Sequence, residues 1–591
     1  MDESYLRFRF RILKRRSHRL AKRTAIGFEA FNSRYILRRT ENLKEVQRFV
    51  LVWLAIVSVS LVLLVSQLRG LNNYYLVAGP KPGGTITEGS VGEIAVINPI
   101  FPENQSNQAA NELVFNGLTR YNGKGQIEPD LAESWQVDET GKIYTVKLRP
   151  GVKWQDGQPF TAKDVVYTFT IVQNPNTNSP LNATWRGITM NIPDDLTVQF
   201  TLPVPFSPFV DSLTTGILPA HLLQTADPSQ LRKIEFNQRP IGTGPFKFKD
   251  FSIAKDEARF TANEDYYEGR PQLDDYIIRT YKDHESLRQA YASQQVLAAG
   301  GLSMADVKDL EGISDIDIEQ IPTTSQSFVF FNTDNPLLSD KKVRQALVSA
   351  TNTQQIVEQL RSNLLVARSP LLPEHIGFNE KILQRDFNKD EANNLLEQAG
   401  WVMGEDGIRR RDGATLTFSI TTQDSDFYPD VAAMLQHQWG EVGVQLQVTL
   451  VSQEDLQKSV VRSRRYDSLL TAITLGGDPD VYPFWHSSQA HDPGLNLSLY
   501  RSSLADQALE AGRTRYDTQL RAAKYEAFTT QWREDSPSVA LFRLNYNFGI
   551  RESILGVDVQ RLVTPPDRYY DVRNWTIKTQ LQLQRLLPQS E

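Results

Sequence analysis

The chain has 591 residues, of which 40% are hydrophobic and 23% are charged, with no cysteine and a formal net charge of −6. This composition is typical of a folded globular protein, and it excludes a largely disordered chain, a collagen-like repeat and a small disulfide-stapled fold. The absence of cysteine also excludes a thiol nucleophile, a redox CxxC pair, a zinc–thiolate or iron–sulfur site and a lipid-modified cysteine anchor.

The charge is divided at a hydrophobic segment near the N-terminus. Residues 1–48 hold 14 Lys and Arg against 5 Asp and Glu, whereas the rest of the chain carries a net charge of −15. Residues 49–68 contain no charge, and a helix of that length spans about 30 Å, enough to cross a bilayer. The positive-inside rule keeps the basic flank in the cytoplasm. We predict a basic cytoplasmic arm (1–48), one transmembrane helix in the plasma membrane (49–68), a linker (69–82) and a large domain in a periplasm or outside the cell.

Alternatives remain for both N-terminal segments. A cleaved signal peptide is less favoured than an anchor, because the apolar run is longer than a usual signal and begins about 48 residues into the chain. The basic arm could bind anionic lipid or a cytoplasmic partner, but fixing the orientation alone accounts for its charge. We do not expect it to bind nucleic acid.

The exported part begins as mixed α+β structure and continues as regular α/β alternation. The first half is predicted to contain a helix over 104–117 with Gly117 as its C-cap and a strand over 133–137. Two strands separated by a turn are predicted within 143–154, followed by a helix over 161–174 that opens with a Thr161–Asp164 capping box. The second half is predicted to contain helices over 339–352, 388–400, 429–439 and 454–464, and strands over 444–451 and 468–475. Ser339 and Asn388 are predicted to cap the N-termini of the first two of these helices.

The loop over 476–489 follows the last of these strands and combines acidic with aromatic residues. In open α/β sheets, ligands bind beyond the carboxyl ends of the strands. Carboxylates among aromatic rings suit a ligand with an ammonium group, through charge-assisted hydrogen bonds and cation–π contacts. Alternatively, the aspartates cap turns and the aromatic rings are core, and composition does not decide between the two. The residues concerned are Asp478, Asp480, Tyr482, Phe484, Trp485 and His486.

The sequence contains no motif that supports catalysis. We find no HExxH, no GxSxG elbow, no GxxxxGK[ST] loop and no histidine spacing typical of a metal site. We therefore expect no enzyme activity, no metal and no cofactor.

Five ordered blocks resemble the family 5 extracellular solute-binding proteins, the oligopeptide- and dipeptide-binding receptors of ABC importers. The longest block, LVFNGLTRYNGKGQIEPDLAESWQVDETGKIYTVKLRPGVKWQDGQPFTAKDVVYTF, is similar almost throughout. It is followed by IGTGPFKFKDF, RFTANEDYYEGRPQLDDYIIR and FVFFNTDNPLLSDKKVRQAL, and then by GGDPDVYPFWHSSQ with GLNLSLYRSSLADQALEAGR. The resemblance covers most of the exported chain.

The resemblance implies an α/β fold of the type II periplasmic-binding kind, with two lobes joined by two crossing strands and an extra small α+β subdomain. The crossings are expected at 327–333 and 538–544. Mapped onto the chain, lobe I covers 83–118, 189–326 and 538–591, the small subdomain covers 119–188, and lobe II covers 327–537.

The resemblance also implies that a peptide is held between the lobes as an added strand and is delivered to permease subunits with their ATPase. The loop over 476–489 would close on the ligand and is called the closing loop below. One of its aspartates would bind the α-ammonium group, and we expect Asp478 in this role, with Asp480 as the alternative. The other predicted ligand contacts are Tyr482 and Trp485 as pocket walls, Asn98 in the first lobe, and Asn496 and Tyr500 in the closing lobe. The protein is expected to be a monomer.

Two other functions fit the same fold. The ligand could be an oligosaccharide, a metal chelate or an opine-like molecule, or the domain could be a sensor that signals through the membrane helix. The helix and the basic arm depart from the family, whose members usually carry a cleaved signal or a lipid-anchored cysteine.

Overall fold

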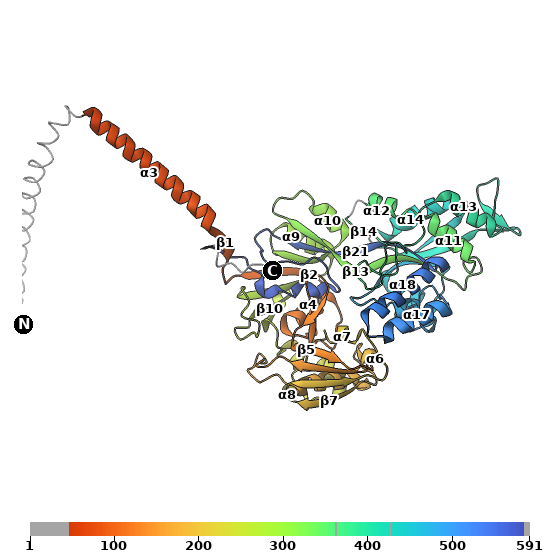
Figure 1. Ribbon diagram of the computed structural model, residues 1–591, viewed down its shortest axis with the longest axis horizontal. Helices are drawn as coiled ribbons and strands as arrows, with labels where there is room; N and C mark the ends of the chain where they lie inside the picture. The colour runs from red at the N-terminus through yellow and green to blue at the C-terminus, as the bar shows by residue number, and fades with distance from the viewer. Residues whose placement is uncertain (1–46, 361–362, 426, 584–591) are drawn as a thin grey trace, which may run out of the picture. The chain divides into compact units, whose positions relative to one another are not determined.

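The computed structural model describes residues 47–360, 363–425 and 427–583, which form two compact units (Figure 1). All but the last two residues of the predicted basic arm lie outside the described residues. The smaller unit contains the N-terminal helix and two short strands, and the larger unit covers Pro80–Lys578.

The N-terminal helix, α3 (Gln47–Tyr75), contains the predicted hydrophobic segment. Its stretch Phe49–Gln67 has a mean hydropathy of 2.8 and is not buried, so it is long and apolar enough to cross a membrane, a property that a signal sequence shares. The prediction of a linker over 69–82 was wrong in part, because α3 continues to Tyr75 and is followed by β1 (Leu76–Pro80). No proline interrupts the backbone hydrogen bonds of this stretch before Pro80.

Strand β1 pairs with β22 (Thr579–Leu583) in a two-stranded sheet. Thr579–Leu583 therefore group with the N-terminal helix. The prediction that lobe I extends to residue 591 placed these strand residues in the wrong unit.

One eleven-stranded sheet runs through both lobes of the larger unit, with parallel and antiparallel neighbours. Its order is β19 (Gln445–Val451), β18 (Thr417–Gln423), β20 (Ser468–Thr474), β13 (Asp317–Phe331), β21 (Ser538–Ile550), β12 (Ala298–Leu302), β2 (Thr85–Val91), β11 (Asp275–Tyr281), β10 (Glu257–Ala262) and β9 (Phe246–Ser252), while β14 (Leu365–Val366) pairs with β21.

The long strands β13 and β21 are the two crossings between the lobes (Figure 1). Their antiparallel register shifts between Pro322 and Gln326, opposite Asn545 and Arg543. On one side of this shift β21 pairs with β12 of lobe I, and on the other side β13 pairs with β20 of lobe II. The predicted first crossing, 327–333, overlaps the end of β13, and lobe II extends to about Arg543 rather than ending at residue 537.

The reason for the later boundary is side-chain burial at the start of β21. Val539, Leu541 and Phe542 belong to the lobe II core together with Val329 and Phe331 of β13. Alternate residues of β13 point to the opposite face of the sheet, as the two-residue period of a strand requires. There, Phe328 and Phe330 join a second lobe II core.

The small subdomain is a four-stranded antiparallel sheet that is larger than predicted. Its order is β5 (Ala132–Val137), β6 (Ile143–Leu148), β8 (Thr197–Thr201) and β7 (Thr189–Asp194), so the predicted end at residue 188 left out its last two strands. Helix α5 (Ala162–Gln173) packs on β7 and β8, and the predicted Thr161–Asp164 capping box is confirmed. A separate hairpin is formed by β3 (Thr119–Tyr121) and β4 (Ile127–Pro129).

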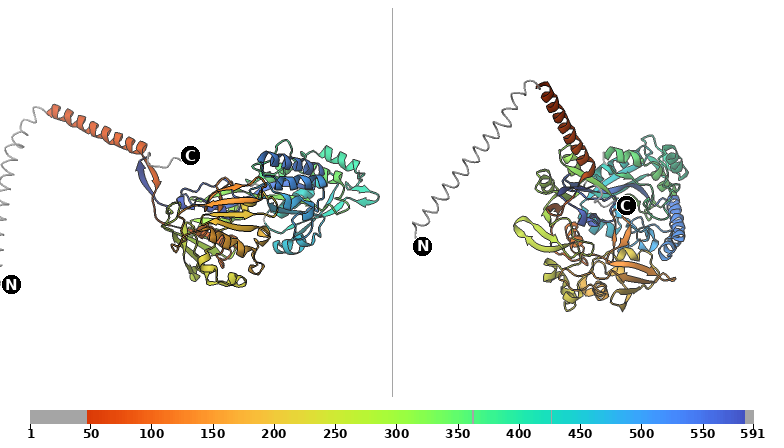
Figure 2. Two further views of the ribbon diagram at one scale, coloured as in Figure 1. Left: turned by 60° about the horizontal axis from the view of Figure 1, so that its bottom comes forward. Right: turned by 60° about the vertical axis from the view of Figure 1, so that its left-hand side comes forward.

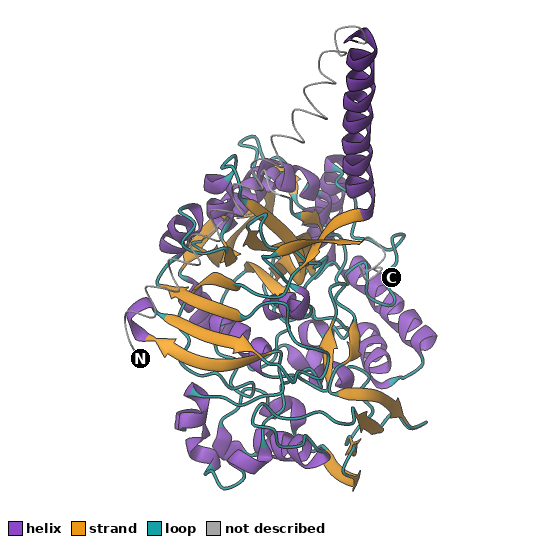
Figure 3. Ribbon diagram, turned by 90° about the vertical axis from the view of Figure 1, so that its left-hand side faces the viewer, coloured by secondary structure: helices purple, strands orange, loops and turns teal. Residues whose placement is uncertain are grey.

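Helices, purple in Figure 3, pack on the strands of both lobes. In lobe I and the subdomain they are α4 (Gln105–Val114), α6 (Asn182–Trp185), α7 (Phe209–Ser212), α8 (Ala220–Leu223), α9 (His284–Ala292) and α10 (Met304–Leu310). In lobe II they are α11 (Lys341–Ser349), α12 (Thr353–Leu360), α13 (Lys389–Gln398), α14 (Tyr428–Gly440), α15 (Gln453–Asp455), α16 (Tyr482–Trp485), α17 (Ser503–Thr514) and α18 (Thr518–Asp535). The blue pair α17 and α18 stays with lobe II in both views of Figure 2.

Three predicted helix ends can be compared with the structure. Asn388 caps α13 as predicted, with its side chain accepting the N–H of Glu391. The cap of α11 is Asp340 rather than Ser339, and α4 ends at Val114, three residues before the predicted cap Gly117. A three-stranded sheet of β15 (Val402–Met403), β16 (Arg409–Arg411) and β17 (Ala414–Thr415) projects from lobe II and was not predicted.

Candidate functional site

The predicted closing loop follows β20 and is held by ion pairs within lobe II. Asp478 accepts two hydrogen bonds from Nη2 of Arg521 on α18, at 2.8 and 2.9 Å. Asp480 accepts bonds from Arg513 on α17, the shortest at 2.6 Å. Burial raises the pKa of the Asp478 carboxyl although Arg521 lies beside it. Both carboxylates predicted to take an ammonium group thus already have a cationic partner in this structure.

The two predicted aromatic walls differ in their positions. Tyr482 is half-buried and stacks on His486 with 4.0 Å between ring centroids, and the Arg513 guanidinium lies 4.0 Å from the centre of the Tyr482 ring. Trp485 is fully buried and packs against Phe330 and its neighbours in the lobe II core. The role of Trp485 as a ligand contact stays a prediction.

The three remaining predicted contacts are buried and bonded within the protein. Asn98 donates to Oδ1 of Asn237 at 2.9 Å. Asn496 donates to the carbonyl oxygens of His486 and Tyr500 and so ties the closing loop to the turn over 496–500. The Tyr500 hydroxyl donates to Asp535 at 2.6 Å. The structure gives these residues a role in shaping the loops, and direct ligand contact by them stays a prediction.

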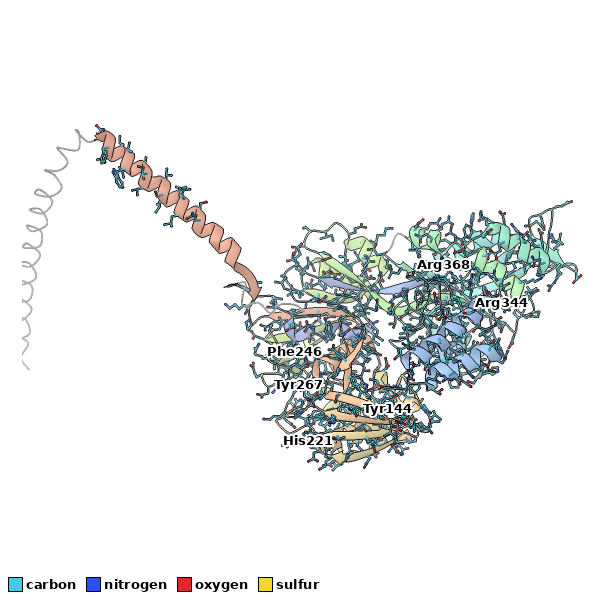
Figure 4. The ribbon with its side chains drawn as sticks, in the orientation of Figure 1. Tyr144, His221, Phe246, Tyr267, Arg344 and Arg368 are labelled. Atoms are coloured by element: carbon cyan, nitrogen blue, oxygen red, sulfur yellow. The ribbon has the colours of Figure 1, made fainter. Side chains whose placement is uncertain are left out.

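The closing loop meets the N-terminal half of the protein at Gly477. A Cβ atom added there would lie 2.8 Å from Cε1 of Tyr121, the last residue of β3. Glycine therefore allows the lobe II backbone to approach a lobe I side chain at this point. Figure 4 shows Tyr144 of the neighbouring β6 on the side of the subdomain that faces lobe II.

We expect Gly477→Ala to weaken this contact by about 1–3 kcal/mol, because the added methyl group overlaps the Tyr121 ring. The fold of each half should persist, since the overlap lies between them. Ligand affinity measured by calorimetry should fall, and the radius of gyration measured by small-angle scattering should rise. Gly440→Ala is the matched control because no atom lies within 4 Å of the added Cβ. Equal affinities for the two variants would contradict the prediction.

A cavity of about 120 Å³ lies beside Tyr121, between α4, the β3–β4 region and the C-terminal segment of lobe I. Its lining is rich in acidic and tyrosine residues. They include Glu112, Asp130 and Asp567, with Tyr121, Tyr266, Tyr569 and Tyr570. Of these acids, Asp130 already accepts hydrogen bonds from Asn116 and Tyr267, and Asp567 accepts one from the Thr564 backbone.

Glu112 differs from its acidic neighbours because it makes no hydrogen bond or ion pair with another described residue. Its side chain is exposed to solvent and lines the cavity. This environment raises the pKa of Glu112 to about 8, first by desolvation and then by the charges of Asp567 and Asp130. The charge of Arg568 acts in the opposite direction, but Arg568 is paired with Glu88, so a cationic ligand could supply a counter-charge beside Glu112.

Glu112 is not among the ligand contacts predicted from the sequence, although its position in the helix gave a signal. It is the only charged residue of α4, and it lies on the face opposite the predicted apolar residues Ala110, Leu113 and Val114. Among the described residues, no group of three His, Asp or Glu side chains could hold a metal ion.

A scan of family models matches residues 126–494 to the bacterial extracellular solute-binding proteins, family 5 Middle. The oligopeptide-binding protein AppA of Bacillus subtilis is 29% identical over 511 residues, which are 84% of this chain and 92% of AppA. The solved structure of AppA with a nonapeptide has a TM-score of 0.67 at 27% identity and covers 85% of this chain and all of AppA.

Other solved structures of the same fold hold other ligands. NikZ of Campylobacter jejuni in complex with Ni(L-His) has a TM-score of 0.69 at 28% identity, and 83% of this chain and 99% of NikZ are covered. AgaA of A. tumefaciens R10 with agropinic acid has a TM-score of 0.65 at 22% identity, over 84% and 99% of the two chains, which shows the fold alone. The predicted type II periplasmic-binding fold and the predicted family are therefore confirmed, and the chain belongs to the family 5 bacterial extracellular solute-binding proteins.

Proposed function

We propose that the protein is a membrane-anchored receptor that captures peptides between its two lobes and delivers them to the permease of an ABC importer. The observation that carries this proposal is the similarity to AppA, whose structure holds a nonapeptide and matches 85% of this chain along the whole AppA chain. Helix α3 would act as the anchor, since its apolar stretch has the length of a bilayer span. No catalytic chemistry is proposed.

The geometry also supports a role for the acidic cavity in peptide recognition. A peptide presents an α-ammonium group, and an unpaired carboxylate can accept charge-assisted hydrogen bonds from it. Glu112 offers such a carboxylate, whereas Asp478 and Asp480 are paired with Arg521 and Arg513. We therefore assign the ammonium contact to Glu112 first and keep Asp478 as the alternative acceptor.

Isothermal titration calorimetry of the full chain in nanodiscs, with a library of peptides of two to about ten residues, tests the peptide proposal. Peptides with free amino termini should bind, and N-acetylated versions of the same peptides should bind at least tenfold more weakly. A library without any binding would overturn the proposal.

A second candidate is a non-peptide solute, which NikZ and AgaA favour because they hold a nickel–histidine complex and agropinic acid. Nickel with histidine and an opine would be titrated in the same way. Binding of either one in the absence of peptide binding would favour this candidate.

A further inference from the structure

The small subdomain and lobe II contact each other through one edge of the subdomain. The backbone N–H of Ser207 donates to the carbonyl oxygen of Arg513, at the end of α17, at 3.0 Å. The guanidinium of Arg513 lies 5.2 Å from the ring of Phe206 in the subdomain and 4.0 Å from that of Tyr482 in lobe II. Together with the Gly477–Tyr121 contact, these interactions close the subdomain against lobe II.

Two carboxylates face this contact from opposite sides. Asp211, on α7, accepts a hydrogen bond of 2.5 Å from the Tyr121 hydroxyl. Asp478 of lobe II lies near enough for its charge to raise the pKa of Asp211. Arg521 is the cation that acts on Asp211, and it is already bonded to Asp478. The neighbouring Asp480 is paired with Arg513.

The surroundings of Asp211 disfavour its ionised form when the contact is made. Desolvation is the largest cause and the charge of Asp478 is the next, while the Tyr121 hydroxyl and Arg521 act in the opposite direction. The net effect raises the pKa of Asp211 to about 7. If the subdomain and lobe II separated, water would hydrate Asp211 again and its pKa would return toward the usual value of about 4.

We propose that closure of the small subdomain onto lobe II takes up one proton, which is held on Asp211 opposite Asp478. The register shift in the two crossing strands marks where the lobes would hinge. The unliganded protein would take up this proton, whichever solute it binds. This uptake makes closure of the receptor responsive to the pH of the compartment outside the membrane.

The direction of the pH effect follows from linkage. The pKa of Asp211 is raised in the closed form. The bound proton therefore stabilises the closed form over the open form most at low pH, and this stabilisation is complete below about pH 4. As the pH rises toward 7, the closure equilibrium should fall by up to about tenfold per pH unit, and above 7 it should level off, because Asp211 is then ionised in both forms.

Distance measurements on the unliganded full chain test the proposal. The chain has no cysteine, so Lys163→Cys in the subdomain and Lys381→Cys in lobe II, both exposed, would carry the only two labels. Single-molecule energy transfer between pH 5 and 8 should show the closed fraction of the wild type falling as pH rises. In Asp211→Asn, whose amide oxygen still accepts the Tyr121 hydroxyl, the fraction should not change with pH.

Two further variants make the test specific. Tyr121→Phe removes a hydrogen bond that stabilises the ionised carboxylate, so the pH at which the decline levels off should move upward. Asp195→Asn, an exposed acid of the same subdomain, should behave as the wild type does. A wild type whose distances do not change with pH, or an Asp211→Asn variant that keeps the wild-type pH dependence, would overturn the proposal. Because no solute is added, neither result bears on whether the protein binds peptides.

Discussion

Replacing Glu88 with alanine is expected to lower the free energy of unfolding by about 3–5 kcal/mol, because it leaves a buried guanidinium without its partner. Glu88, on β2, is fully buried, and its Oε1 lies 2.6 Å from Nη2 of the buried Arg568. Its other carboxylate oxygen accepts the hydroxyl groups of Tyr276 and Tyr569. The Arg568 guanidinium otherwise lies over aromatic rings. Asp567 and Glu112 are near enough for Arg568 to act on their charges, but among the described residues only Glu88 forms an ion pair with it.

Chemical denaturation followed by tryptophan fluorescence would measure this loss, since the chain has nine tryptophans. Glu264→Ala is the matched control: it removes an acid that pairs with Arg270 at 2.9 Å on the surface, and it should cost less than 1 kcal/mol. Glu88→Leu combined with Arg568→Met should recover most of the loss, because it removes both charges together. A Glu88→Ala variant as stable as Glu264→Ala would contradict the prediction.

Local signals in the sequence predicted the parts of the fold whose causes are local. The apolar run over 468–475 predicts a strand, and the structure confirms it as the largely buried β20. The Thr161–Asp164 box and the Asn388 cap depend on residues three positions apart, so they too can be identified from the sequence. Domain ends were predicted less well, because the last strands of a sheet depend on distant partners. Strand β8 of the small subdomain, for example, pairs with β6 about 50 residues earlier.

The candidate site was harder to predict for the same reason. Asp478 and Asp480 are prominent in sequence, but their partners Arg521 and Arg513 lie on two later helices, and no spacing rule connects them. Glu112 is the opposite case. Its position on the polar face of α4 was visible, but the cavity in front of it is completed by residues 564–573, about 450 positions later in the chain. The sequence can show that a carboxylate lies on the polar face of its helix, but only the fold shows which residues lie opposite it.

Replacing Glu112 with glutamine is expected to weaken the binding of peptides with a free amino terminus by at least about 30-fold, or 2 kcal/mol, because the ammonium group loses its charged acceptor. Calorimetry would measure the affinity. N-acetylation of the peptide removes the other member of the same pair, so acetylated peptide should bind the wild type and Glu112→Gln equally well. If acetylation weakened binding to Glu112→Gln as much as it does for the wild type, the acceptor would be another residue, and Asp478→Asn would be the next variant to compare.

The pH dependence of peptide binding separates Glu112 from Asp211, because the two carboxyl groups act in opposite directions. Glu112 has a pKa of about 8 without ligand, and a bound ammonium group favours its ionised form, so binding at pH 7 should release a proton through Glu112. Its contribution to affinity should therefore rise with pH and level off above about 8. Closure through Asp211 should take up a proton and contribute most at low pH. Titrations in phosphate and in Tris, whose ionisation heats differ, would count the protons: Glu112→Gln should shift the balance toward uptake and Asp211→Asn toward release. Shifts in the same direction for both variants would contradict this assignment of the two carboxyl groups.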